Sequence, residues 1–146
     1  MRIDIYSDTV CPWCYLGKRR FELAVAARPQ YEPQVTWRPF ELNPEIPSDG
    51  VDRAGYLEAR LGIEAGLAEH ESRSALILRA GQDGVIAAER HAAVLGITGV
   101  PTFVFDGQYT ISGAQEVGTL ARILDQVADF GAARDADRDS AHDVAS

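Results

Sequence analysis

Two cysteines stand two residues apart in the stretch Cys11-Pro12-Trp13-Cys14, and the chain contains no others. They follow the apolar run Ile3-Asp4-Ile5-Tyr6, which is typical of a β-strand. Two thiols at this spacing can close a small disulfide ring. Where a strand leads into a helix, the first thiol also becomes an unusually acidic nucleophile. The spacing therefore predicts a redox centre.

The position of Pro12 indicates which cysteine is the nucleophile. Proline has a fixed backbone angle and no N–H, so it suits the first position of a helix and places Cys11 at the N-cap. There the sulfur can accept hydrogen bonds from the amides of Trp13 and Cys14, and the helix dipole favours the thiolate. Because Trp13 carries no charge, we expect a pKa of intermediate acidity for Cys11. Cys14, one turn further along, is then the resolving thiol.

Two other uses of this motif are a structural zinc site and an inert disulfide. Structural zinc needs four ligands. The chain has no second cysteine pair, and His70, His91 and His142 lie in polar or charged runs. A bridge that closes so short a loop removes little chain entropy. We therefore predict no metal site and a redox role for Cys11 and Cys14.

The first third of the chain has the pattern of a parallel βαβ unit. The sequence predicts a strand over 2–7, a helix from Pro12 to about Ala27 that is buried over much of its circumference, and a second strand over 35–42. Asp8 precedes the helix, and two roles are open for it: a turn or cap residue, or a proton shuttle for Cys14.

The rest of the chain predicts a helical insertion over about 48–96, then a hairpin and a last helix. Helices are expected over 51–61, within 63–79 and around 85–95, the last capped by Gly96. A strand follows Pro101, Asp106-Gly107 forms a hairpin turn, and a strand returns over 108–112. Spacing of apolar residues from Val117 to Ala128 predicts the final helix.

Length and composition indicate one α/β domain over 1–130 and a disordered tail over 131–146, because the tail contains mostly Ala, Asp, Arg and Ser. A net charge of −8 argues against a nucleic-acid partner. The chain has no 18-residue apolar run and no signal peptide, so we expect no membrane partner and a cytoplasmic location, where paired thiols are more often catalytic than structural.

Three segments together resemble thioredoxin-fold proteins of the DsbA type, and in particular FrnE-like proteins and 2-hydroxychromene-2-carboxylate isomerases. The matching segments run from Tyr6 to Gly17, from Trp37 to Pro44 and from Gly96 to Val104, and Ser112-Gly113-Ala114-Gln115 completes the set. They occur in the order of the family. The resemblance implies a thioredoxin-like fold of the form βαβ, helical insertion, α, ββα.

The resemblance also implies a complete redox site. Cys11 is the attacking thiolate, Cys14 the resolving thiol, and Pro101 a cis proline that faces the pair. The backbone of Val100 and Thr102 is left free for an extended substrate, and Trp13 offers it an aromatic face. The implied activity is that of a protein-disulfide oxidoreductase, with a redox-active disulfide and no bound cofactor.

The chain departs from the family in the insertion, which is usually considerably longer. A join near Gly62-Ile63 connects the first insertion helix to segments that resemble the last ones. A shortened lid would expose apolar surface near Leu76-Ile77-Leu78, so we expect a homodimer.

Two alternative functions follow from the same residues. One is a glutathione-dependent isomerase, in which glutathione is a co-substrate; those relatives typically have serine where Cys11 stands. The other is a non-catalytic binding module that has lost its full lid. The expected substrate of the oxidoreductase is a protein or small molecule that carries a disulfide or thiol.

Overall fold

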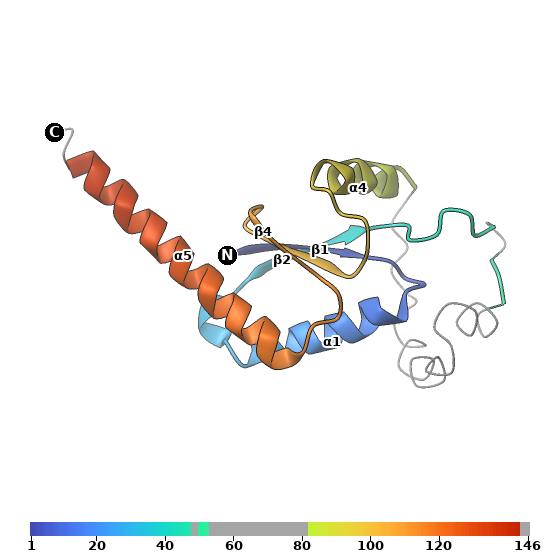
Figure 1. Cartoon of the computed structure of the whole chain (residues 1–146), viewed down its shortest axis with the longest axis horizontal. Coiled ribbons are helices and arrows are strands. Elements are labelled where there is room, and N and C mark those ends of the chain that lie inside the picture. Colours follow the sequence, from blue (N-terminus) through green and yellow to red (C-terminus); the bar gives the residue numbers. More distant parts are fainter. Residues whose placement is uncertain (48–49, 53–81, 144–146) are drawn as a thin grey trace.

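The computed structural model describes residues 1–47, 50–52 and 82–143, which form a four-stranded β-sheet with helices on both faces (Figure 1). The elements in chain order are β1 (Arg2–Ser7), α1 (Pro12–Ala26), the 3-10 turn η1 (Pro29–Tyr31), β2 (Gln34–Pro39), α4 (Gln82–Val94), β3 (Thr102–Phe105), β4 (Tyr109–Ser112) and α5 (Val117–Asp143). The strand order is β2-β1-β3-β4, with β1 and β2 parallel and the other two pairs antiparallel. The predicted α/β class, βαβ unit and hairpin are confirmed.

β1 lies in the middle of the sheet, and its two sets of alternating side chains face opposite layers. Ile3 and Ile5 pack among the helices on one face, in a buried cluster with Phe21, Ala24, Phe103, Phe105, Leu120, Ala121, Leu124 and Val127. Tyr6 faces the other side and packs with Ala92, Ile97 and Val104. The sheet therefore separates two apolar clusters, one under α1 and α5 and one under α4.

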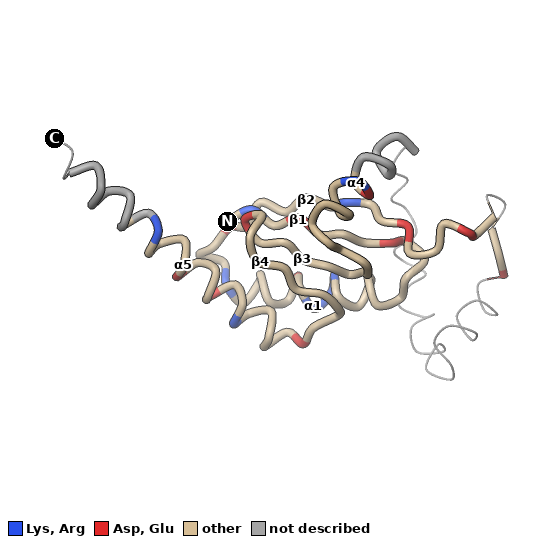
Figure 2. Tube along the Cα trace, turned by 45° about the horizontal axis from the view of Figure 1, so that its top comes forward, with Lys and Arg blue, Asp and Glu red and all other residues tan. Residues whose placement is uncertain are grey.

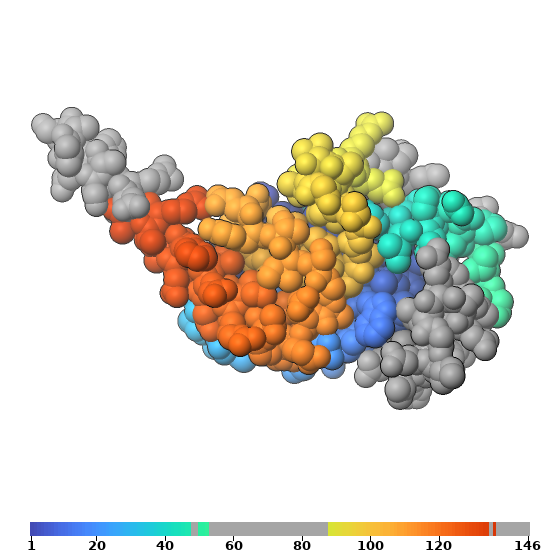
Figure 3. Space-filling model, viewed as in Figure 1, coloured from blue at the N-terminus to red at the C-terminus, as the bar shows by residue number. Residues whose placement is uncertain are grey.

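In the space-filling view of Figure 3, the surface of α4 (yellow) lies above the surface of β3, β4 and the start of α5 (orange). Charged residues are distributed over several elements and do not gather on one face of the trace (Figure 2).

α1 presents a single buried stripe to the sheet. Beyond the first turn, this stripe consists of Cys14, Gly17, Phe21 and Ala24, at spacings of three and four residues. Leu23, between them, is 58% exposed. The start of the helix at Pro12 is confirmed. Among the described residues, the helix is not buried over much of its circumference as expected, because apolar positions such as Leu23 lie on its exposed side.

β2 ends earlier than the sequence predicts. The strand ends at Pro39, and the amide of Phe40 still donates to the carbonyl of Ser7, the last residue of β1, at 3.0 Å. The amide of Glu41 donates to the Glu89 carboxylate of α4 at 3.3 Å, and that of Leu42 to the Asp8 carboxylate at 2.7 Å. The amides of Glu41 and Leu42 thus bond to side chains and not to a neighbouring strand.

The predicted glycine positions are confirmed at both turns. Gly96, after α4, has a φ of +69°, and the amide of Ile97 bonds back to the carbonyl of Ala92 at 2.9 Å, which closes the helix. In the hairpin, Asp106 and Gly107 have φ values of +50° and +69°, as a tight turn between right-twisted strands requires.

The C-terminal segment differs from the prediction. α5 continues to Asp143 and runs beyond the sheet (Figure 1), so the predicted disordered tail is wrong for residues 131–143. The segment contains no proline and is rich in alanine, and a helix already started on the sheet extends at low cost. Phe130 stacks on Tyr109 at 5.6 Å, and Arg134 bonds to Gln108 at 2.7 Å, so α5 also contacts the hairpin.

The helices predicted over 51–61 and 63–79 fall almost entirely outside the described residues, as do His70, the join at Gly62-Ile63 and the apolar run Leu76-Ile77-Leu78. The shortened insertion, and the homodimer expected from it, stay predictions. Among the helices in the described ranges, none combines the length and apolar composition that a membrane crossing needs.

Candidate active site

Cys11 is the N-cap residue of α1, with Pro12 in the first turn, as the sequence predicts. It has extended backbone angles, φ −85° and ψ 114°, so its side chain stands at the helix start. The amide of Cys14 donates to the Cys11 carbonyl at 3.1 Å, and the sulfur makes no capping hydrogen bond of its own. The amides of Trp13 and Cys14 nevertheless interact with the sulfur and lower the pKa of Cys11, as the sequence predicts.

The pKa of Cys11 is lowered from its ordinary value of 9.0 to about 7. The largest cause is the interaction with the Cys14 thiol, which supports the Cys11 thiolate as a donor; burial opposes it. The backbone amides of Cys14 and Trp13 lower the pKa further, and the negative charge of Asp8 raises it. This agrees with the intermediate acidity expected for a motif without a cation between its cysteines.

Cys14 has the opposite character. It is 3% exposed, and its pKa is raised, first by its interaction with Cys11 and then by burial. The amide of Asp8 donates to its sulfur at 3.4 Å. Both thiols are free in this structure. One acidic thiol and one protonated thiol therefore stand side by side at the start of α1.

The Val100–Pro101 peptide bond is cis, and β1 and β3 are neighbours in the sheet, so this bond lies beside the dithiol. The Cys11 thiol donates to the carbonyl oxygen of Val100 at 3.9 Å. Pro101 is fully buried, whereas Val100 is half-buried. The structure thus brings together Cys11, Cys14 and the residues on either side of this bond.

Trp13 and Thr102, also predicted to contact substrate, lie in different environments. Trp13 is 43% exposed at the surface of the first turn of α1. Thr102 is fully buried, and its hydroxyl donates to the Gly99 carbonyl at 2.7 Å and bonds to Ser112 at 2.9 Å. Its hydroxyl is therefore engaged in holding the loop before β3.

Asp8 is almost fully buried, and both of its carboxylate oxygens accept backbone hydrogen bonds. One accepts from the amide of Val10 at 2.9 Å and the other from the amide of Leu42 at 2.7 Å. These bonds are those of a turn residue that also fastens the segment after β2 to the loop that carries Cys11. The sequence pattern could not indicate Leu42, because its amide meets Asp8 only in the folded chain.

The three cations that follow the motif are ion-paired. Lys18 and Arg19 pair with Glu22 at 2.5 and 3.3 Å, and Arg20 pairs with Glu116 at 2.8 Å. Among the described residues, no group of three or more His, Cys, Asp or Glu side chains is placed to hold a metal ion.

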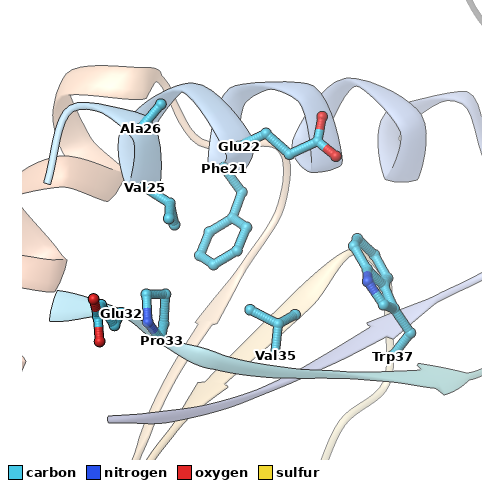
Figure 4. A pocket seen from close by; sticks show the side chains of 8 residues that line it. All are labelled: Phe21, Glu22, Val25, Ala26, Glu32, Pro33, Val35 and Trp37. Atoms are coloured by element: carbon cyan, nitrogen blue, oxygen red, sulfur yellow. The ribbon is translucent and has the colours of Figure 1, made fainter. Parts of the chain in front are cut away.

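A separate pocket of about 540 Å³ lies between α1 and the edge strand β2, away from the two thiols (Figure 4). Phe21, Val25, Val35 and Trp37 give it an apolar lining, with Glu22 and Glu32 at its rim. None of the predicted site residues lines it.

Comparison with known proteins places this chain in a family. The family model described as a DSBA-like thioredoxin domain matches residues 2–63 and 57–125, two stretches that overlap over residues 57–63. The uncharacterized protein YwbO of Bacillus subtilis is 44% identical over 52 residues. That alignment covers 36% of this chain and 24% of YwbO, so the chain spans about a quarter of the length of this relative.

Two solved structures are similar to this chain. The crystal structure of a probable DsbA oxidoreductase, SCO1869 from Streptomyces coelicolor, aligns over 87% of this chain and 89% of its own, with 28% identity and a TM-score of 0.63. A 2-hydroxychromene-2-carboxylate isomerase aligns over 90% of this chain and 98% of its own, with 14% identity and a TM-score of 0.47, which is too distant to indicate an activity. On the sequence match and the shared fold, this chain belongs to the DsbA-like thioredoxin domain family.

Proposed function

We propose that the protein is a thiol–disulfide oxidoreductase whose dithiol is Cys11 and Cys14, with Pro101 beside the pair. The observation that carries this proposal is the unequal pair of thiols at one helix start: the pKa of Cys11 is lowered to about 7, and that of Cys14 is raised. Near neutral pH such a pair supplies a nucleophile and a proton-bearing partner at the same time.

The proposed reaction transfers two electrons from the dithiol to a substrate disulfide. The Cys11 thiolate attacks one sulfur of the substrate, which forms a mixed disulfide and releases the first substrate thiolate. Cys14 then loses its proton and attacks the Cys11 sulfur, which forms the Cys11–Cys14 disulfide and releases the second thiolate. Protonation of both leaving thiolates completes the reduction, and the same steps in reverse oxidise a substrate dithiol.

The raised pKa of Cys14 supports its role as the second thiol in this sequence. Both thiols are buried, Cys11 at 7% and Cys14 at 3% exposure, and they interact with each other, so what separates their roles is that Cys14 keeps its proton more firmly. Trp13, at 43% exposure, and the half-buried Val100 provide apolar surface around Cys11. We therefore propose that substrates are proteins or small molecules that present a disulfide next to apolar groups.

Reduction of insulin disulfides by dithiothreitol, with and without the protein, tests this function. We expect catalysis by the wild type and its complete loss in Cys11→Ser. The matched variant Cys14→Ser keeps the nucleophile and lacks the resolving thiol, so it should accumulate a mixed disulfide with substrate. Equal activity of wild type and Cys11→Ser would overturn the proposal. Isomerase activity that requires glutathione and survives Cys11→Ser would instead support the isomerase alternative.

A further inference from the structure

We propose that Gly17 is a positioning residue of the dithiol site: because it lacks a side chain, the ring of Pro101 can rest against α1, and this contact sets where the Val100 carbonyl stands relative to Cys11. The inference deepens the proposed function and rests on it for its kinetic readout.

Gly17 of α1 lies directly against the ring of Pro101. Gly17 lies on the buried stripe of α1, between Cys14 and Phe21. A Cβ atom added to Gly17 would lie 2.8 Å from Cγ and 3.4 Å from Cβ of Pro101. Carbon atoms do not approach to 2.8 Å without displacement. The proline ring therefore occupies the space that a side chain at position 17 would need.

Pro101 cannot relieve this contact by rotating a side chain. The ring of Pro101 is closed onto its own backbone nitrogen through Cδ, so without the backbone Cγ can shift only by a change of ring pucker, whereas Cβ is held by its bond to Cα. Pro101 is fully buried, and its carbonyl accepts from the amide of Gly113 at 2.8 Å. We therefore expect a methyl group at position 17 to change the pucker of the ring and to move the segment at Val100 and Pro101 away from α1.

The other neighbour of Gly17 is also held in place. Cα of Ala114 lies 3.6 Å from the same added Cβ. The carbonyl of Ala114 accepts from Arg20 at 2.7 Å, and Arg20 also pairs with Glu116 at 2.8 Å. The added methyl group cannot turn toward this loop to relieve the contact, so the displacement falls on Pro101.

Displacement of Pro101 changes the surroundings of the Cys11 thiol. The carbonyl that precedes Pro101 is the acceptor for the Cys11 thiol, at 3.9 Å. When Val100 moves, the thiol loses that acceptor, and the backbone beside Cys11 moves with it. Glycine is also the least favourable residue after proline inside a helix, and the contact with the Pro101 ring gives a reason for its place here.

Gly17→Ala tests the inference, with Gly131→Ala as the matched control, because a Cβ at Gly131 in α5 meets nothing within 4 Å. Loss of the Val100 acceptor destabilises the neutral thiol, so the pH profile of Cys11 alkylation should move to lower pH in Gly17→Ala. The KM for a disulfide-bonded peptide should rise about tenfold, with kcat changed by less than about twofold. Gly131→Ala should change neither quantity.

The inference is overturned if Gly17→Ala folds and both its alkylation profile and its KM match those of Gly131→Ala. The alkylation profile needs no enzymatic activity, so it tests Gly17 even if the wild type reduces no disulfide and the proposed function fails. If Gly17→Ala does not fold, the same change is made in a Pro101→Ala background, which lacks Cγ. Folding is then expected to return, and an equal loss of folding in both backgrounds contradicts the contact.

Discussion

The backbone amides of Trp13 and Cys14 at the start of α1 lower the pKa of the Cys11 thiol, whereas burial helps to raise the pKa of the Cys14 thiol. The order of the residues predicts this difference, because Pro12 fixes where the helix begins. The Val100 carbonyl and the Leu42 amide come from other parts of the chain, and no local pattern indicates their contacts with Cys11 and Asp8. The place of the two thiols at the start of α1 was therefore predictable from the sequence, and the resemblance placed Pro101 beside them, but the contacts made by Val100 and Leu42 were not predictable.

The Asp8 carboxylate has two effects: its charge raises the pKa of Cys11, and its oxygens accept hydrogen bonds from backbone amides. The variant Asp8→Asn tests both. Removing its negative charge should lower the pKa of Cys11 further, because Asp8 raises that pKa. The amide nitrogen of Asn cannot accept from Leu42, so we also expect a loss of about 1–3 kcal/mol in the free energy of unfolding. The pH profile of iodoacetamide labelling and urea unfolding measure the two effects.

The exposed neighbour Glu41 provides the control for this prediction. Glu41→Gln removes one negative charge without touching the Asp8 bonds, and solvent screens it, so neither quantity should change. An unchanged or raised Cys11 pKa in Asp8→Asn would contradict the role assigned to the Asp8 charge.

At the scale of elements, periodicity predicted β1, the start of α1 and the β3–β4 hairpin, because the residues of each element carry the signal themselves. The errors lie where an element ends by meeting another part of the fold. β2 stops at Pro39, and soon after it the amides of Glu41 and Leu42 bond to the side chains of Glu89 and Asp8. α5 continues past residue 131, where the composition alone resembles that of a disordered tail.

The apolar stripe of α1 should carry most of its packing energy. Phe21 is 3% exposed, and its ring centroid lies 5.4 Å from that of Phe103. Phe21→Ala should therefore lower the free energy of unfolding by about 3–5 kcal/mol. Leu23→Ala removes a side chain of the same helix that is 58% exposed and should cost less than about 1 kcal/mol. Urea denaturation measures both, and equal losses would contradict the assigned stripe.

An ion-paired cluster joins the end of α1 to α5. Arg28 donates to both carboxylate oxygens of Asp125, at 2.7 and 2.9 Å, and the hydroxyl of Tyr31 donates to Asp125 at 2.8 Å. These donors hold the pKa of Asp125 below its ordinary value of 3.8. The cluster therefore stabilises the fold above that pH, and its contribution is lost as the pH falls through the lower pKa of the folded state.

Asp125→Asn tests this contribution. It should lower the Tm at pH 7, and the difference from wild type should shrink as the pH falls below about 4. Glu41→Gln, which removes an exposed carboxylate outside this cluster, is the control and should leave the Tm unchanged at pH 7 and below pH 4. A difference between Asp125→Asn and wild type that does not depend on pH would show that the carboxylate charge is not what joins the two helices.

At the scale of the whole molecule, the sheet and the helices on its two faces hold the start of α1 against the start of β3. Because this arrangement changes the pKa of Cys11, the free energy of unfolding depends on the ionisation of that thiol. The folded chain lowers the pKa of Cys11 from 9.0 to about 7, so folding favours the thiolate. A group with a lowered folded pKa stabilises the fold above its unfolded pKa, and that stability is lost as the pH falls through the folded value.

The reduced protein should therefore gain stability between pH 7 and 9, by an amount on the order of 2 kcal/mol relative to Cys11→Ser. Urea unfolding of both proteins at pH 6, 7 and 8.5, in the presence of a reductant, measures this gain. A difference that stays constant from pH 6 to 8.5 would contradict the lowered pKa of Cys11.

The central claim is that Cys11 and Cys14 form one two-electron redox couple. Equilibration of the protein in glutathione buffers of graded potential, followed by alkylation and mass measurement, tests it most directly. We predict one transition between a doubly alkylated dithiol and an unalkylated protein that contains the Cys11–Cys14 disulfide, with the slope of a two-electron process. Failure to form the intramolecular disulfide at any potential would contradict the account.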